Sequence, residues 1–191
     1  MTRANARELA VHLIYGQKFT GEEPQQVVST RLEKEYYAQL SAENEVYTER
    51  PSRAQLRYID NVVAGVANRE EELNAAIQQF SIGWDVTRIS KLTRSIMQLA
   101  IYEILYVEDV PTGVAISEAV RLSKKYDNED TGSFVNGILG AYARSLNAPA
   151  APAAPAADSC PAVCSSSAPP ADNCRPSAAA SASGCRHPGR H

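Results

Sequence analysis

The last 44 residues of this 191-residue chain lack every large apolar side chain, and this limits where the chain can fold. Positions 148–191 contain 14 Ala, 8 Pro and 7 Ser, but no Leu, Ile, Met, Phe, Tyr or Trp. Such a segment cannot bury enough apolar surface to offset the entropy lost on ordering it. We therefore predict one folded domain over residues 1–147, long enough for a sizeable core, followed by a disordered tail.

The charge of the predicted domain limits its partners. The tail carries two Asp and three Arg, a formal +1, so the whole-chain charge of −3 leaves −4 on residues 1–147. This value excludes a globally basic coat, and any contact with RNA or DNA must be a local patch. No apolar run approaches the roughly 20 residues that span a bilayer, and the polar N-terminus does not resemble a secretory signal. We expect a cytoplasmic protein without membrane contact.

The domain has the pattern of consecutive amphipathic helices. Apolar residues recur every three or four positions, and no stretch shows the alternation typical of a strand. Ser52 and Gln55 form a capping box, and Asp130 or Thr131 is expected to cap the last helix. The predicted helices cover about residues 4–19, 24–40, 52–80, 90–107, 115–126 and 131–147, with a polar loop over 41–51. The fold class is therefore all-α, a bundle of about six or seven helices.

The sequence offers no constellation for catalysis. It contains no P-loop, dinucleotide-binding fingerprint, G-x-S-x-G elbow or H-E-x-x-H motif. The domain has no cysteine and one histidine, His12, and a lone helical histidine is more often a surface or boundary residue than a catalyst. We expect Glu70, Glu71 and Glu72 to form a solvated face, because metal sites need ligands from several elements. We predict no catalytic residue and no cofactor.

The tail contains four cysteines and two histidines, His187 and His191, which raises the question of a zinc site. Three, nine and ten residues separate the successive cysteines, which are Cys160, Cys164, Cys174 and Cys185. The paired C-x2-C spacing of zinc knuckles is absent, and Ala/Pro sequence gives no scaffold for a tetrahedral site. We favour a disordered tail and predict no metal.

Arg3 and Arg7 are four residues apart near the start of the first helix, so we expect them to share one exposed face. Guanidinium groups suit phosphate oxygens and base edges. Neither arginine has an obvious acidic partner on this face, because Glu8 points about 100° away from Arg7. A solvated helix face explains the two arginines equally well.

Three motifs in the second half of the domain carry a family resemblance. Residues 94–106 read RSIMQLAIYEILY, residues 109–126 read DVPTGVAISEAVRLSKKY, and residues 128–139 read NEDTGSFVNGIL. With the opening helix RELAVHLIY at residues 7–15, these motifs closely resemble the bacterial transcription antitermination factor NusB family. The resemblance covers residues 3–146 and implies an all-α fold of two small helical subdomains.

The resemblance also implies a function without catalysis. NusB-like proteins bind the boxA element of nascent ribosomal RNA transcripts together with a NusE-type small-subunit ribosomal protein. The resulting antitermination complex helps RNA polymerase to resist termination across ribosomal RNA operons. The resemblance leaves open whether two copies pair as a homodimer, and it says nothing about the tail.

Carried over residue by residue, the family's RNA site maps onto the opening helix and the FVNG motif, with the end of the preceding helix beside it. The candidate RNA-binding residues are Arg3, Arg7, Tyr15, Lys124, Phe134 and Asn136. Each has a structural alternative. Phe134 and Tyr15 suit core packing as well as RNA contact, Lys124 suits the negative end of a helix dipole, and Gly137 beside Asn136 suits close helix packing.

Two other functions remain open. The first is a protein-interaction module without its own RNA site, which the presence of only two arginines in the opening segment favours. The second is an RNA-modifying enzyme, because NusB-like domains also precede some ribosomal RNA methyltransferases. An enzyme of that kind needs a downstream α/β cofactor domain, whereas this chain continues into the apolar-poor tail, so we expect a non-enzymatic RNA-binding factor.

Overall fold

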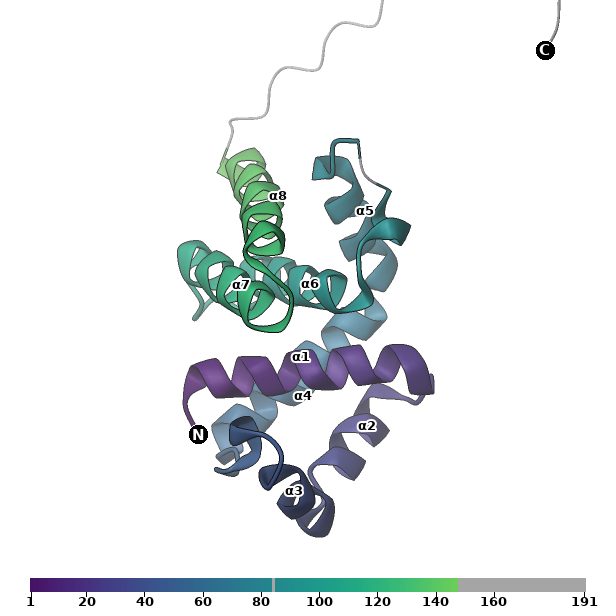
Figure 1. Cartoon of the computed structure of the whole chain (residues 1–191), viewed down its shortest axis with the longest axis vertical. Coiled ribbons are helices and arrows are strands. Elements are labelled where there is room, and N and C mark those ends of the chain that lie inside the picture. The colour runs from purple at the N-terminus through teal and green to yellow at the C-terminus, as the bar shows by residue number, and fades with distance from the viewer. Residues whose placement is uncertain (84, 148–191) are drawn as a thin grey trace, which may run out of the picture. The chain divides into compact units, whose positions relative to one another are not determined.

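A computed structural model of the chain describes residues 1–83 and 85–147. Eight α-helices and two short 3-10 helices, η1 and η2, form this part, which contains no strand (Figure 1). The predicted all-α fold is therefore confirmed. The predicted disordered tail and its cysteines, residues 148–191, lie outside the described residues.

The helices follow one another with short connections. Their bounds are α1 Arg3–Thr20, α2 Pro24–Arg31, α3 Lys34–Ser41, η1 Glu45–Tyr47, α4 Arg53–Asn68, α5 Glu70–Phe80, η2 Val86–Arg88, α6 Lys91–Tyr106, α7 Thr112–Tyr126 and α8 Glu129–Asn147. None of the described helices is long and apolar enough to cross a membrane.

Local sequence sets several helix ends. Thr2 Oγ1 accepts a hydrogen bond from the backbone N–H of Asn5 and so caps α1, which ends at Gly21 in the left-handed region with φ 66°. The predicted capping box is present at α4, where Ser52 and Gln55 bond reciprocally. These caps satisfy backbone groups that a helix end leaves unpaired.

Two of the predicted helices are each broken into two. The expected helix over 24–40 ends at Arg31, and Glu33, with φ −53° and ψ 141°, is not helical before α3 begins. The expected helix over 52–80 breaks at Arg69, whose φ of −121° and ψ of 24° are not helical. The second break lets α4 pack on α1, α2 and α6 while α5 packs on α6 and α8.

Two further predictions need correction. The polar loop over 41–51 contains the 3-10 helix η1, which buries Val46 and Tyr47 in the core. The last helix is capped neither by Asp130 nor by Thr131. The side chain of Asn128 accepts the hydrogen bond from the backbone N–H of Thr131, at 2.8 Å.

The helices form two groups that meet along α1, α4 and α6. Helices α1–α4 lie together in the lower part of Figure 1 and α5–α8 in the upper part, within one compact unit. Gly65 of α4 allows a close approach to α6, because a Cβ atom there would lie 2.2 Å from the Tyr102 ring. Helices α7 and α8 pack on each other and on α6, which places the α7–α8 turn beside the start of α6.

Candidate nucleic-acid interface

Arg7 is buried, so the prediction that it lies on an exposed face without an acidic partner is wrong. Its side chain is 4% exposed, and its Nε lies 2.9 Å from both carboxylate oxygens of Glu103 on α6. Glu118 of α7 lies 3.7 Å from Nη1, and Tyr58 of α4 donates a hydrogen bond to Glu103 at 2.7 Å. The acidic partners come from other helices, which a count along α1 does not reveal. Burial lowers the pKa of Arg7, but the charge and hydrogen bond of Glu103, together with Tyr58 and the charge of Glu118, raise it above its usual value overall.

Glu8, the next residue, is also buried, and its negative charge is surrounded by positively charged side chains. Its Oε1 accepts hydrogen bonds of 2.6 Å from Lys125 Nζ and from the Tyr126 hydroxyl, and Arg121 Nη1 lies 3.5 Å from Oε2. Burial raises the pKa of Glu8, but the hydrogen bonds from Lys125 and Tyr126, together with the charges of Lys125 and Arg121, hold it below its usual value. The carboxylate is therefore ionised and serves only as an acceptor.

His12 lies one turn further along α1 and joins two tyrosines. Its Nδ1 is 3.1 Å from the Tyr47 hydroxyl of η1, and its Nε2 is 2.7 Å from the Tyr126 hydroxyl of α7. Burial lowers the pKa of His12, an effect only partly opposed by Glu8. The residue is half-buried, which agrees with the expected surface or boundary position.

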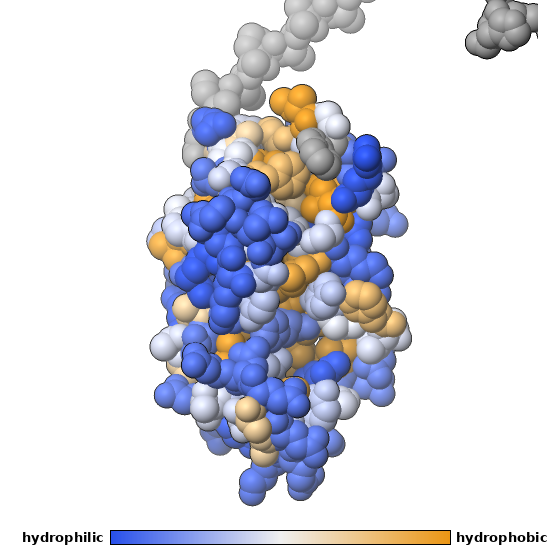
Figure 2. Space-filling view, viewed as in Figure 1, coloured by the Kyte–Doolittle hydropathy of each residue, from blue (hydrophilic) through white to orange (hydrophobic). Residues whose placement is uncertain are grey.

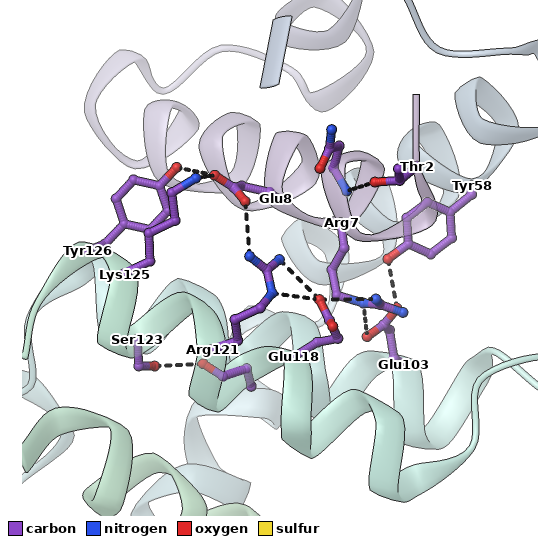
Figure 3. Close-up of polar contacts among 12 residues, drawn as sticks. Thr2, Arg7, Glu8, Tyr58, Glu103, Glu118, Arg121, Ser123, Lys125 and Tyr126 are labelled. Atoms are coloured by element: carbon purple, nitrogen blue, oxygen red, sulfur yellow. Dashed lines mark hydrogen bonds and ion pairs between the residues drawn. The ribbon is translucent and has the colours of Figure 1, made fainter. Parts of the chain in front are cut away.

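Arg7 and Glu8 thus fix α1 against the C-terminal helices. Figure 3 shows Arg7 pointing towards Glu103 and Glu118, while Glu8 points towards Arg121, Lys125 and Tyr126. Buried ionic groups of this kind are tolerated only when they are paired and hydrogen-bonded. The paired charges hold the last turn of α7 in place beside α1.

The structure places the other candidates at three locations. Arg3 is exposed at the start of α1. Tyr15 is half-buried and packs edge-to-face on Phe19 at 5.0 Å, and Lys91 Nζ of α6 lies 4.2 Å from the centre of the Phe19 ring. Twelve residues of helix separate Arg3 from Tyr15, about 18 Å. Arg3 is therefore remote from the start of α6, and Tyr15 lies near it.

Phe134 lines a pocket of about 290 Å³ between the start of α6 and the α7–α8 turn. The lining residues are Arg88, Ile89, Ser90, Thr93, Asp127, Asn128, Asp130, Thr131 and Phe134. Ser90 and Asn128 cap α6 and α8, so both helix starts face this pocket. The pocket combines an aromatic ring with both hydrogen-bond donors and hydrogen-bond acceptors.

Lys124, ten residues before Phe134, and Asn136, within the FVNG motif, are both exposed. Lys124 Nζ lies 2.5 Å from Glu129, and its aliphatic stem passes so close to Gly132 that a Cβ atom there would lie 2.6 Å from it. No atom lies within 4 Å of a Cβ placed on Gly137, so the alternative of close helix packing at that glycine is wrong.

Sequence reasoning missed Arg88 and Lys91, which flank the start of α6. Their position was a usable signal, because the positive end of a helix dipole disfavours cations there. Glu70, expected on a solvated face, is half-buried and lies 2.5 Å from Lys18 Nζ. No group of three His, Cys, Asp or Glu side chains suited to a metal ion occurs in residues 1–83 and 85–147.

Comparison with known proteins places the chain in a family. The NusB family model matches residues 4–144. The transcription antitermination protein NusB of Acetivibrio thermocellus is 39% identical over 140 residues, which cover 73% of this chain and 87% of the relative. That of Symbiobacterium thermophilum is 34% identical over 146 residues, with 76% and 92% covered.

Solved structures agree on the fold. NusB of T. maritima superposes with a TM-score of 0.63 at 24% identity, covering 75% of this chain and 92% of that one. A chain from the crystal structure of antitermination factors NusB and NusE in complex with double-stranded RNA gives 0.61 at 22% identity, covering 75% and 96%. The protein therefore belongs to the NusB family of transcription antitermination proteins.

Proposed function

We propose that this protein binds boxA-type RNA together with a NusE-type ribosomal protein and thereby supports antitermination in ribosomal RNA operons. Membership of the NusB family supports the proposal, as does the solved complex of a NusB protein with NusE and RNA. We propose that the complex of this protein, the NusE-type protein and the RNA acts on RNA polymerase.

The observation that carries this proposal is the pocket beside Phe134. Sequence-specific RNA recognition targets unstacked bases, which stack on aromatic rings and form hydrogen bonds through their edges. The pocket provides the ring of Phe134 together with the hydroxyls of Ser90 and Thr93 and the polar side chains of Asp127 and Asn128. An unpaired base placed there could both stack on the ring and form hydrogen bonds through its edge.

The phosphates would be contacted by cations around this pocket. Arg88 lines it, and Lys91 and Lys124 are exposed on the elements that form it. We assign no RNA contact to Arg7, because it is buried and paired with Glu103. Arg3 is exposed but lies at the far end of α1 from Tyr15, so its contact would be with a more distant part of the RNA.

A NusE-type partner would extend this contact surface. The domain carries a net charge of −4, so its own affinity for a polyanion is expected to be low. Figure 2 shows hydrophobic side chains among hydrophilic ones near the ends of α5 and α8, where Ile82 is 93% and Leu146 49% exposed. A partner bound to such side chains would add its own weak RNA contact to that of this protein. The two linked contacts would together bind the RNA more strongly than either one alone.

Replacing Phe134 with Ala tests the proposal. We expect RNA affinity to fall by about tenfold, because one base–aromatic stacking contact contributes about 1–3 kcal/mol. Tyr106→Ala is the matched control, since Tyr106 is an exposed ring at the opposite end of α6. Equal RNA affinity of Phe134→Ala and wild type would reject the pocket, and failure of wild type to bind RNA with its partner would favour the protein-interaction module.

A further inference from the structure

We infer that Tyr126, together with His12, is a positioning residue for the pocket beside Phe134. The two side chains complete a hydrogen-bond relay that runs from η1 across α1 to the last turn of α7. This inference rests on the proposed RNA-binding function of that pocket. It assigns Tyr126 no RNA contact of its own.

Donor and acceptor chemistry fixes the direction of the relay. Glu8 is ionised, so the Tyr126 hydroxyl must donate its single hydrogen to Glu8 Oε1 at 2.6 Å. The Tyr126 oxygen can then only accept from His12 Nε2 at 2.7 Å, which places the proton on Nε2. The other ring nitrogen, Nδ1, is left to accept from the Tyr47 hydroxyl at 3.1 Å.

Every group in the relay is held by its surroundings. The Glu8 side chain is 2% exposed, Tyr47 is buried, and the His12 ring stacks on Tyr47 and meets Tyr126 edge-to-face at 5.5 Å. Lys125 Nζ also binds Glu8. Two consecutive residues at the end of α7 are thus tied to one buried carboxylate on α1.

The pocket begins one residue beyond this anchor. Asp127 and Asn128 directly follow Tyr126, and both line the pocket. Asn128 also caps α8, the helix that carries Phe134. A shift of the last turn of α7 would therefore move one wall of the pocket and the cap of the helix that presents the aromatic ring. Such a displacement would weaken the binding of a base in the pocket, although every group that contacts the base would still be present.

Replacing Tyr126 with Phe tests this role, and the chain supplies a matched control. Tyr58 also donates a 2.7 Å hydrogen bond to a buried glutamate, Glu103, but it lies on α4 and outside the pocket. Both Tyr→Phe variants therefore lose a hydroxyl hydrogen bond to a buried glutamate, and Tyr126→Phe loses in addition the bond with His12 that defines the relay. The measurements are RNA affinity as a function of salt, with the NusE-type partner present, and the melting temperature of each variant.

We expect Tyr126→Phe to lower RNA affinity by about fivefold with an unchanged salt slope, because no phosphate contact is lost. Tyr58→Phe should lower the melting temperature to a similar degree and leave affinity within about twofold of wild type. Equal losses of affinity in both variants, or none in Tyr126→Phe, would overturn the inference while wild-type binding upholds the proposed function. Absence of RNA binding by wild type would overturn both.

The relay itself has a readout that needs no RNA. Nitrogen-15 spectra of the histidine side chains of the free protein at neutral pH should show His12 as the tautomer protonated at Nε2. In Tyr126→Phe the His12 signals should shift as the acceptor is lost, whereas in Tyr58→Phe they should stay in place. The opposite tautomer in wild type would contradict the relay.

Discussion

Arg7 and Glu8 show how two adjacent residues of opposite charge can both be buried. Arg7 reaches Glu103 on α6, while Glu8 reaches Lys125 and Tyr126 on α7. Each charge is compensated across a helix interface, so removing one partner leaves the other uncompensated in a buried position. Both residues therefore fix the position of α1 in the fold and are unavailable to a ligand.

Replacing Arg7 with Ala is expected to lower the free energy of unfolding by about 3–5 kcal/mol, because the buried carboxylate of Glu103 loses its partner. Chemical denaturation measures this quantity. The matched variant Arg3→Ala should unfold as wild type does, since Arg3 is exposed. A similar stability of the two variants would show that the pair with Glu103 does not hold α1.

His12 predicts a pH dependence of stability. Burial lowers its pKa, opposed by Glu8 and assisted by the charge of Lys125, so the folded protein binds this proton less readily than the unfolded chain. Where the unfolded state binds more protons, stability falls with decreasing pH. The loss begins as the pH drops through the unfolded value of about 6.5.

The variant His12→Gln keeps an amide for Tyr47 and Tyr126 but does not titrate in this range. Denaturation at a series of pH values from 7.5 to about 5 should therefore show a shallower decline for the variant than for wild type. Acidic groups such as Glu8, whose pKa is lowered, lose their contribution only at lower pH, below about 4.3. If the stabilities of the two proteins declined in parallel as the pH falls, His12 would be excluded as the group responsible for the pH dependence.

At the scale of helices, local signals predicted starts better than breaks. The capping box at Ser52 indicated the start of α4, whereas no Gly or Pro at Arg69 indicates the break there. The apolar period of α4 resumes in α5 after one gap at Glu70, so the pattern resembles one long helix. The break arises from tertiary packing, because α5 turns to contact α8, and a single-helix pattern cannot show this.

Two glycines within helices should respond oppositely to Ala. Gly65→Ala puts a methyl group 2.2 Å from the buried Tyr102 ring and should cost about 1–3 kcal/mol of stability through overpacking. Gly137→Ala meets open space and should gain about 0.5–1 kcal/mol from helix propensity. Thermal unfolding of both variants measures the difference. Stabilisation by Gly65→Ala would mean that α4 and α6 do not pack this closely.

At the scale of the whole molecule, the sequence correctly predicted the all-α class. It also indicated Phe134 as a candidate RNA contact, but it did not predict the pocket around that residue. The pocket forms where η2 meets the α7–α8 turn, two segments about forty residues apart with no shared sequence pattern. Arg7 was misplaced for the same reason, since its partners belong to α6 and α7. Contacts between distant segments determine both features.

Truncation after Asn147 is expected to leave stability and RNA binding unchanged. Residues 148–191 contain no large apolar side chain with which to dock on the domain. The melting temperature of the truncated protein should stay within about 2 °C of the full chain, and its RNA titration should superimpose. A larger fall, or one zinc ion per chain that depends on Cys160 and Cys164, would contradict this expectation.

The measurement that most directly tests the proposed function is the titration of a labelled boxA-type RNA with the full chain, in the presence and absence of a NusE-type protein. The net charge of −4 on the domain predicts weak binding by the chain alone. We predict that the partner raises the affinity at every salt concentration, as a second linked contact requires. Equal affinity with and without the partner would contradict cooperative recognition of RNA by this protein.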